Sequence, residues 1–329
     1  MKVIIPVAGA GTRLRPHTLT QPKVLMNVAG HPMIYYIVQQ LIEKKLASDI
    51  IFITGNRGDE IQHYLKKTFQ RKFSYAEQEQ ALGLGHAVLC AKDKFDPIKN
   101  ECALIILGDT LFDVNLKDMV KSRHSVIGVK KVDDPRRFGV VEKNKYGYIT
   151  RFVEKPATPE VSPSSEAIVG LYYVKNSTLL FNSLESLIKN EITTKGEFQL
   201  TDALEIMINK EDKMKTYTVP GWLDCGKKET ILETNAYLLK KSRKRYKIKN
   251  TVIKNPVFIG ENVTLDNCVI GPNATINSNC HIKKSTVVNS IIDENCRIQN
   301  SVITDSLLGR HVKVTNKKGI FSLGEYSEA

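Results

Sequence analysis

A six-residue spacing of branched apolar residues in the last quarter of the chain constrains its fold more than any other feature. The spacing appears in the steps 259–265, 270–276–282, 292–298 and 308–314, where every position holds isoleucine, leucine or valine. Valine or a small residue stands four positions after several of them, namely Val263, Ala274, Cys280, Cys296, Val302 and Val312. Such a hexapeptide repeat is typical of a parallel β-helix, whose sides each place one apolar and one small residue inside.

The repeat also has a longer period of 16 to 17 residues, which runs through Ile259, Ile276, Ile292 and Leu308. We interpret this period as one coil, so that about four coils of a left-handed β-helix occupy residues 251–315. An antiparallel sandwich would leave the repeated step unexplained. The polar residues that follow, 316–329, are expected to form a flexible tail.

Residues 1–240 alternate short apolar strands with helical patterns, which is typical of a parallel sheet covered by helices. The pattern predicts strands at 3–8, 50–54 and 103–107 and helices at 34–44 and 61–69. Later strands that look antiparallel are predicted at 125–132, 139–142, 149–154 and 167–174. We therefore expect a Rossmann-like, three-layer α/β domain whose later strands form a substrate-binding lobe, followed by a basic linker at 241–250.

The net charge of +13 is compatible with several kinds of anionic partner. Much of it lies in the run Lys240, Lys241, Arg243, Lys244, Arg245, Lys247 and Lys249. No nucleic-acid motif accompanies this run, so we interpret it as a solvated helix end and linker and expect no nucleic-acid partner. No apolar stretch approaches the roughly 20 residues of a membrane span, and no secretory signal is recognisable. A cytoplasmic protein without a membrane partner is expected. The six cysteines form no C-x-x-C pair, which argues against a zinc site.

The N-terminal apolar strand leads into a glycine-rich loop, Gly9-Ala10-Gly11-Thr12-Arg13, and Pro22-Lys23 follows. The dinucleotide fingerprint would need a third glycine where Leu14 stands, and the Gly-Lys-Ser/Thr of a Walker A loop is missing. Glycines nevertheless let backbone N–H groups approach phosphate oxygens. Arg13 offers a planar fork for phosphate and Lys23 a compact charge, so the loop indicates binding of a nucleoside triphosphate.

Further motifs follow in order along the first 230 residues. They are Gln78 with Gly83-Leu84-Gly85-His86-Ala87, Leu107-Gly108-Asp109, Phe138-Gly139-Val140-Val141, Phe152-Val153-Glu154-Lys155-Pro156, Gly196-Glu197-Phe198-Gln199-Leu200-Thr201-Asp202 and Trp222-Leu223-Asp224-Cys225-Gly226. Together with the opening loop they resemble the sugar-nucleotide pyrophosphorylase family, whose members join a sugar 1-phosphate to a nucleoside triphosphate. The resemblance implies that a sugar-phosphate oxygen attacks the α-phosphorus and that pyrophosphate leaves.

The resemblance also implies roles for individual residues. The implied catalytic residues are Arg13, Lys23, Asp109, Lys155 and Asp224, of which Asp109 and Asp224 would bind Mg²⁺. The implied nucleotide-binding residues are Ala8, Gly9, Gly11, Thr12, Arg13, Lys23, Gln78, Gly83 and Asp109. The implied sugar-phosphate-binding residues are Gly139, Glu154, Lys155 and Ile168. A glutamine amide both donates and accepts, so Gln78 could match O4 and N3–H of a pyrimidine.

Two cues point to different branches of this family. Ile5 to Gly9 and Gly83 to Leu89 resemble bacterial UTP–glucose-1-phosphate enzymes, whereas the length and the β-helix resemble thymidylyltransferases and mannose-1-phosphate guanylyltransferases. Gln78 favours glucose 1-phosphate with dTTP or UTP, and a mannose-1-phosphate guanylyltransferase is the alternative. We expect the β-helix to hold a homo-oligomer together or to serve regulation.

Two further alternatives concern the kind of activity. Acyltransferases with a hexapeptide repeat usually require a catalytic histidine, for which His281 and His311 are available. A non-catalytic regulatory subunit would be expected to lack one of Arg13, Lys23, Asp109 or Asp224, and all four are present.

Overall fold

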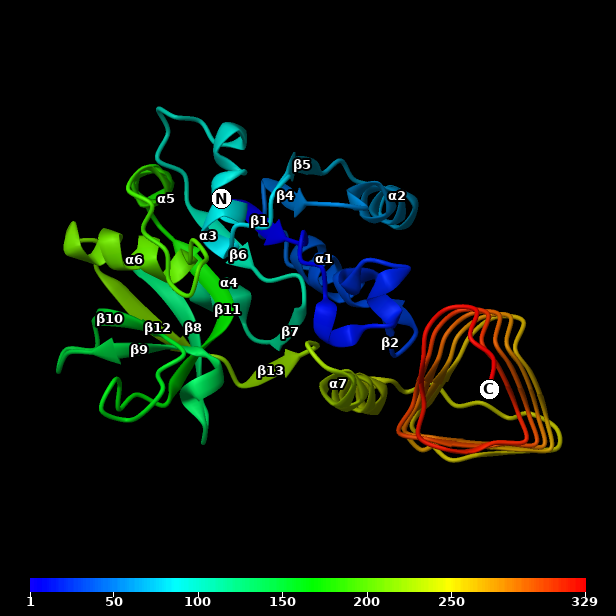
Figure 1. Cartoon of the computed structure of the whole chain (residues 1–329). Coiled ribbons are helices and arrows are strands. Elements are labelled where there is room, and N and C mark those ends of the chain that lie inside the picture. The colour runs from blue at the N-terminus through cyan, green and yellow to red at the C-terminus, as the bar shows by residue number, and fades with distance from the viewer. The chain divides into compact units, whose positions relative to one another are not determined.

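The computed structural model describes residues 1–329 and divides them into two compact units (Figure 1). The first, here called the sheet unit, contains Met1–Gly9 and Ile37–Trp222. The second, here called the coil unit, contains Ala10–Tyr36 and Leu223–Ala329. No helix is both long and apolar enough to cross a membrane.

The parallel half of the sheet unit forms around its N-terminal strand. Strand β1 (Lys2–Pro6) lies between β4 (Asp49–Thr54) and β6 (Ala103–Ile106), and β5 (Ser74–Glu77) follows outside β4, all parallel. All four residues of β6 are buried. An all-apolar strand is stable here because both of its faces are covered, as the sequence predicts.

The other half of this sheet is mainly antiparallel. Strand β11 (Glu166–Val174) pairs antiparallel with β6 and with β8 (Ser125–Lys131), and β9 (Gly139–Lys143) pairs antiparallel with β10 (Ile149–Glu154). β12 (Met214–Thr218) extends the sheet in parallel beside β8. The predicted α/β fold with a later antiparallel lobe is thus confirmed, and both halves share one sheet.

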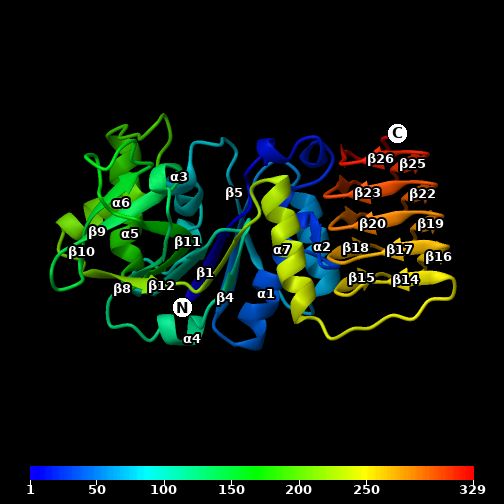
Figure 2. The same cartoon turned by 90° about the horizontal axis from the view of Figure 1, so that it is seen from below.

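Helices cover this sheet. Those of the sheet unit are α2 (Gly58–Thr68), α3 (Leu84–Leu89), α4 (Leu116–Met119), α5 (Ser177–Lys189) and α6 (Leu200–Asn209), with the short 3₁₀ turns η4 (Lys92–Lys94) and η5 (Pro135–Arg137) and the strand β7 (Thr110–Asp113). Helix α1 (Met33–Glu43) begins in the coil unit and ends in the sheet unit. α3, α5 and α6 pack together and against the sheet through buried residues such as Val88, Leu184 and Met207 (Figure 2).

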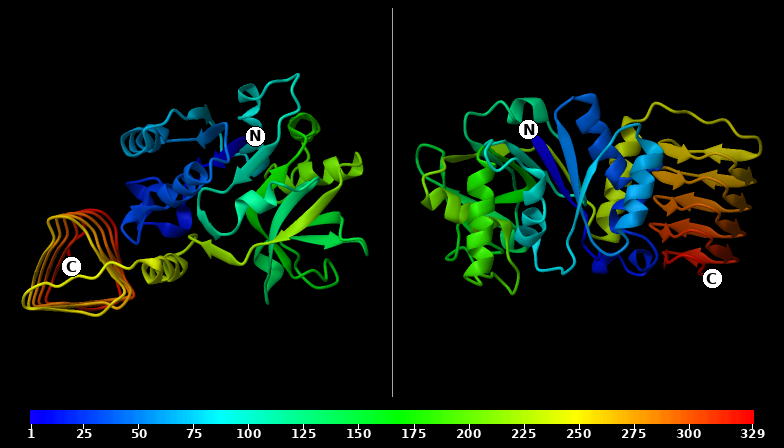
Figure 3. Two further views of the ribbon diagram at one scale, coloured as in Figure 1. Left: turned by 180° about the vertical axis from the view of Figure 1, so that it is seen from behind. Right: turned by 90° about the horizontal axis from the view of Figure 1, so that it is seen from above.

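The coil unit contains the predicted parallel β-helix, whose coils have a triangular outline (Figures 1 and 3). The first side consists of β14 (Thr251–Ile253), β17 (Cys268–Ile270), β20 (Thr286–Val288), β23 (Val302–Thr304) and β26 (Lys318–Gly319). The second side consists of β15 (Val257–Ile259), β18 (Ala274–Ile276), β21 (Ile291–Ile292), β24 (Leu307–Leu308) and β27 (Ser322–Leu323). The third side consists of β16 (Thr264–Asp266), β19 (His281–Lys283), β22 (Arg297–Gln299) and β25 (Lys313–Thr315).

The register of these strands confirms the predicted coil length. Ile259 pairs with Ile276, Ile276 with Ile292, and Ile292 with Leu308. Cys268, Cys280 and Cys296 are buried inside the coils, where the Cys296 thiol donates a 3.0 Å hydrogen bond to the carbonyl of Gly309. Many turns between sides are built on asparagine with positive φ, a conformation that asparagine tolerates better than most residues; these are Asn262, Asn267, Asn273, Asn279, Asn289, Asn295, Asn300 and Asn316.

The coils continue beyond the predicted end at residue 315, so the expected flexible tail at 316–329 is wrong. β26 and β27 belong to a further coil, and the Ala329 N–H donates to the Lys313 carbonyl at 3.0 Å. Phe321 and Leu323 pack against the interior. Ile320 continues the six-residue step after Val314, but it is 62% exposed, and the neighbouring Phe321 packs against the interior instead. The backbone hydrogen bonds that join neighbouring coils do not depend on side chains.

The remaining elements of the coil unit lie outside the β-helix. They are η1 (Thr12–Leu14), η2 (His17–Leu19), η3 (Lys23–Leu25), β2 (Asn27–Val28), β3 (His31–Pro32), β13 (Gly221–Asp224), whose first two residues belong to the sheet unit, and α7 (Lys228–Lys241). Contacts therefore divide the chain differently from the boundary predicted at residue 240, because residues 10–36 and α7 pack with the β-helix. In the predicted linker 241–250, the side chains of Tyr246 and Ile248 pack against the β-helix interior.

Candidate active site

Asp109 lies at the carboxyl end of the central strand β6. The N–H of Gly108 donates to the carbonyl of Pro6 at the end of β1, and the hydroxyl of Thr110 donates to Asp109 Oδ1 at 3.2 Å. Ala8 also follows β1, and a Cβ built on Gly55 would lie 3.1 Å from its Cβ. Ligands of parallel α/β sheets bind at this edge, so the sheet places Ala8 and Asp109 where a nucleotide would be expected.

Gln78 is 7% exposed and follows strand β5. Its Nε2 donates to the carbonyl of Gly83 at 3.0 Å and lies 3.1 Å from Nδ1 of His86. Burial lowers the pKa of His86, so the neutral ring can accept this hydrogen bond. Both amide hydrogens of Gln78 are thereby engaged, and the carbonyl Oε1 is left for a ligand. The base contact predicted for Gln78 stays a prediction, and with these partners its carbonyl oxygen is the group that could accept from a base.

No role is assigned to His86 from the sequence, although this residue stands in the motif Gly83 to Ala87. Its position in the first turn of α3, directly after Gly83, is the signal that could have indicated one. Gly83 has φ +110, and a Cβ there would lie 2.7 Å from the carbonyl oxygen of Phe198. The glycine therefore lets the segment at Phe198 approach α3 and brings His86 to Gln78.

Three of the four predicted sugar-phosphate residues meet at one point of the sheet. Gly139 begins β9 and pairs with Glu154, the last residue of β10. A Cβ built on Gly139 would lie 2.8 Å from Glu154 Oε2 and 3.3 Å from Ile168 Cδ1. Lys155, the fourth, has φ +49, and its Nζ lies 3.4 Å from Glu154 Oε1. The four residues thus form a small site with a carboxylate and an ammonium group side by side.

Two aromatic residues near this site were not assigned a role from the sequence. The indole Nε1 of Trp222 is buried without a hydrogen-bond partner, and its ring contacts Phe138 edge to face at 4.9 Å between centroids. Burial, and then the charge of Glu154, raise the pKa of Tyr172. A buried N–H without a partner is unusual, and it is a donor that a bound ligand could use.

The glycine-rich loop of the coil unit closes on itself. Gly11 has φ +61, and a Cβ there would lie 2.9 Å from Thr18 Cγ2 and 3.1 Å from Lys23 Cβ. The Thr18 hydroxyl donates to the Gly11 carbonyl at 2.8 Å. Thr12 and Arg13 are exposed, whereas Lys23 is 8% exposed. Glycine is required at this turn because any side chain would separate its two arms.

Arg13 and Asp224 converge in the same unit. A Cβ built on Gly226 would lie 3.0 Å from Arg13 Nη2 and 3.0 Å from Asp224 Oδ1, and the Gly226 N–H donates to that oxygen at 3.0 Å. The Asp-Cys-Gly turn therefore brings a phosphate-binding candidate and a metal-binding candidate together. A larger residue than glycine would come between them.

The donors assigned to Mg²⁺ have suitable chemistry. Asp109 belongs to the sheet unit and Asp224 to the coil unit, and no group of three or more His, Cys, Asp or Glu side chains that could hold a metal ion is present. Mg²⁺ commonly binds one or two carboxylates and completes its shell with water and substrate phosphates. Asp109 and Asp224 fit that pattern, and their joint binding of the ion stays a prediction.

The two histidines considered for acyl transfer lie on the β-helix. His281 is exposed on β19. The ring of His311 stacks on Tyr326 with 4.6 Å between centroids. Neither ring makes a hydrogen bond to a carboxylate that would orient it as a base.

In the basic run, the ammonium group of Lys241 lies over the ring of Tyr237, and that of Lys244 lies over the ring of Phe258.

Comparison with known proteins gives three consistent findings. The family described as "Nucleotidyl transferase" matches residues 2–241. The bifunctional protein GlmU of Methanocaldococcus jannaschii is 36% identical over 265 residues, which are 79% of this chain and 60% of that protein. The UTP–glucose-1-phosphate uridylyltransferase AglF of Haloferax volcanii is 30% identical over 234 residues, which are 69% of this chain and 91% of that protein.

A solved structure is also similar. A UDP-glucose pyrophosphorylase complexed with UDP-glucose superposes with a TM-score of 0.62 at 26% identity, covering 73% of this chain and 99% of that one. The chain spans about three fifths of the length of the GlmU relative, and nearly all of AglF and of the solved enzyme.

Proposed function

Because this chain belongs to the nucleotidyl transferase family, we propose that it transfers a nucleotidyl group to a sugar 1-phosphate. The reaction would convert a nucleoside triphosphate and a sugar 1-phosphate into a nucleoside diphosphate sugar and pyrophosphate. The observation that carries this proposal is the site formed by Gly139, Glu154 and Ile168 with Lys155 beside it. The carboxylate suits sugar hydroxyls and the ammonium group suits a phosphate.

Each charged residue then has a definite task. Lys155 would hold the sugar phosphate, whose ionised oxygen attacks the α-phosphorus without a general base. Arg13 and Lys23 would bind the triphosphate and offset the charge of the departing pyrophosphate. Asp109 and Asp224 would hold Mg²⁺, which supplies charge neutralisation for the phosphates when it is bound.

We propose UTP and glucose 1-phosphate as the substrates, with dTTP as the alternative nucleotide. AglF is named as a UTP–glucose-1-phosphate uridylyltransferase, and the solved enzyme binds UDP-glucose. The free Oε1 of Gln78 can accept the N3–H of uracil or thymine. Guanine also carries a ring N–H, so mannose-1-phosphate guanylyltransferase stays the second candidate for the site.

A pyrophosphate-release assay tests the function. Purified protein is mixed with UTP, dTTP, CTP, GTP or ATP and with glucose, mannose or N-acetylglucosamine 1-phosphate in the presence of Mg²⁺. We expect release only when nucleotide, sugar phosphate and metal are all present, with UTP and glucose 1-phosphate fastest. Release without a sugar phosphate would indicate a hydrolase, and none under any condition would contradict the proposal.

Removal of the metal and of its proposed ligands forms the second arm of this test. Chelation by EDTA should abolish turnover, and added Mg²⁺ should restore it. Asp109→Asn and Asp224→Asn should each lower kcat at least about 100-fold, because loss of a ligand leaves phosphate charge uncompensated. Thermal unfolding of each variant serves as the control for folding. Unchanged turnover in either variant would contradict the metal assignment.

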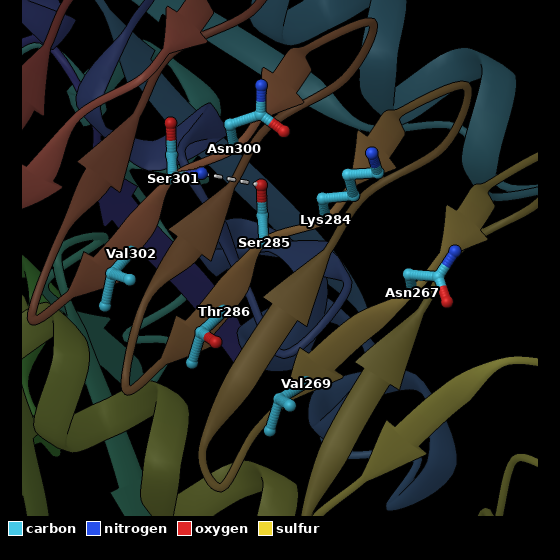
Figure 4. A pocket seen from close by; sticks show the side chains of 8 residues that line it. All are labelled: Asn267, Val269, Lys284, Ser285, Thr286, Asn300, Ser301 and Val302. Carbon is cyan, nitrogen blue, oxygen red and sulfur yellow. Dashed lines mark hydrogen bonds between the residues drawn. The ribbon is translucent and has the colours of Figure 1, made fainter.

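We also propose that the chain forms a homo-oligomer in the cytoplasm through the first side of the β-helix. Val252, Val269, Thr286 and Val302 lie in register on this side, and Val252 is 55% exposed. A groove of about 430 Å³ beside them is lined by Asn267, Val269, Lys284, Ser285, Thr286, Asn300, Ser301 and Val302 (Figure 4). A ladder of β-branched residues that is exposed at Val252 and half-buried at Val269, Thr286 and Val302 suits packing against a second copy.

A further inference from the structure

Residues 10–36, which carry Arg13 and Lys23, pack along the second side of the β-helix within the coil unit. Their contacts with this side, direct or through α7, run from its first coil to its last, at Phe258, Thr275, Asp293 and Ser322. A loop that binds a flexible triphosphate must be held in one conformation. The contacts that hold residues 10–36 against the β-helix are therefore important for the proposed function.

The first of these contacts joins Asn27 to Asp293. The Asn27 amide donates to Asp293 Oδ1 at 2.8 Å. The same oxygen accepts from Asn277 Nδ2 and from the N–H of Glu294, both at 3.0 Å. Asp293 is only 5% exposed, and burial raises its pKa while the hydrogen bonds from Asn27, Glu294 and Asn277 act in the opposite direction. A buried carboxylate oxygen with three donors fixes each donor in position.

A second contact lies at the last coil. His17 Nε2 lies 3.1 Å from the hydroxyl of Ser322, and a Cβ built on Gly324 would lie 3.1 Å from Pro16 Cβ. His17 is 5% exposed, and burial lowers its pKa to about 4. The ring is therefore neutral near pH 7, and it lies buried between the loop and the last coil, where it forms a hydrogen bond with Ser322.

The third contact passes through helix α7. Asn235 Oδ1 accepts from the N–H of Ala29 at 2.8 Å and from the hydroxyl of Thr275 at 2.6 Å. The Asn235 amide donates to the carbonyl of Asn273 at 3.1 Å. At the first coil, the ring of Phe258 lies so close to Gly30 that any side chain there would overlap it.

We propose that Asn27, Asp293 and His17 are positioning residues, through which the β-helix holds the loop in the conformation that binds the triphosphate. Arg13 stands four residues before His17, and Lys23 stands four residues before Asn27. Arg13 and Lys23 are therefore each only four residues away from a residue that contacts the β-helix. This inference rests on the proposed function, because it assigns the anchored loop to the nucleotide.

An exchange of the two partners tests the proposal. Asn27→Asp would place two carboxylates at hydrogen-bond distance in a buried position. We expect the KM for UTP to rise about tenfold, with the KM for glucose 1-phosphate unchanged, because only the nucleotide loop is displaced. The double variant Asn27→Asp with Asp293→Asn restores one amide and one carboxylate, and the KM for UTP should return to within about threefold of the original.

Further variants keep the test decisive. Asn262→Asp makes the same chemical change at an exposed turn of the β-helix and should leave both KM values unchanged. Ser322→Ala removes only the hydroxyl that contacts His17 and should raise the KM for UTP about threefold. It tests the proposal even if Asn27→Asp fails to fold. Calorimetric binding of UTP without sugar phosphate provides a readout apart from turnover, and thermal unfolding reports folding.

The outcomes separate the two proposals. Normal turnover with an unchanged KM for UTP in Asn27→Asp and Ser322→Ala would overturn the positioning role alone. Equal rises in both KM values, or no rescue by the double variant, would show general damage and would also overturn it. Wild-type protein that releases no pyrophosphate would overturn the proposed function, and UTP binding weakened by Asn27→Asp would then still support the anchored loop.

Discussion

At the scale of single residues, orientation decides what the candidate site can recognise. The sequence indicates that Gln78 lies near the nucleotide, but a glutamine amide can turn either way. The structure directs Nε2 toward Gly83 and His86, so in our proposal the carbonyl oxygen is the group of Gln78 that contacts the base. A single acceptor is complementary to the N3–H of uracil and not to the unprotonated N3 of cytosine.

Replacement of His86 tests this orientation. In His86→Leu, Nε2 loses one of its two partners, and the amide can turn to offer a donor. We expect the preference for UTP over CTP in kcat/KM to fall about tenfold, which corresponds to one hydrogen bond of about 1.4 kcal/mol. His63→Leu, an exposed site on α2, is the matched control. An unchanged preference in His86→Leu would show that another group fixes the amide.

The sugar site leads to a second prediction at this scale. Lys155→Met keeps the length of the side chain and removes its charge. The KM for glucose 1-phosphate should rise about 30-fold, the cost of one charged hydrogen bond to phosphate, while the KM for UTP stays the same. Lys145→Met, at an exposed turn, is the control. A larger effect on UTP than on the sugar would place Lys155 at the nucleotide.

At the scale of elements, strands and coils could be predicted from the sequence because their signals are local. The apolar run at β6 indicates a strand that is buried on both faces, and the six-residue step at 259–314 indicates which residues face the interior of the coils. The final coil could not be predicted because Phe321 and Leu323 fall outside the step. The packing of residues 10–36 on the β-helix could not be predicted either, since partners such as Asn27 and Asp293 are hundreds of residues apart.

Acid should weaken the contact between this loop and the β-helix. Burial lowers the pKa of His17 from 6.5 to about 4, so the folded state favours the neutral ring. Its contribution to the free energy of unfolding is complete above pH 6.5 and is lost as the pH falls toward 4. The loss should reach about 3 kcal/mol. His17→Gln should lack it, so the difference between the two proteins in urea unfolding should change over that range and stay constant above it.

At the scale of the whole molecule, the proposed homo-oligomer would form through a side of the β-helix that no other part of the chain covers. The second side is occupied by residues 10–36, whereas the first side presents Val252, which is 55% exposed, and the half-buried Val269 and Val302. Val252→Lys should lower the mass measured by light scattering to that of a single chain, because a charge would be buried in the contact. Thr315→Lys on the third side should leave the mass unchanged. A constant mass in both variants would move the contact elsewhere.

The division into units has a consequence for exchange of parts between related enzymes. A chimera joined at residue 240 would combine residues 10–36 of one parent with the coils of another. The contacting positions 27 and 293 would then come from different parent proteins. A functional graft therefore needs to carry the N-terminal loop together with the distant C-terminal coils. Among related chains, substitutions at Asn27 should therefore be accompanied by substitutions at Asp293.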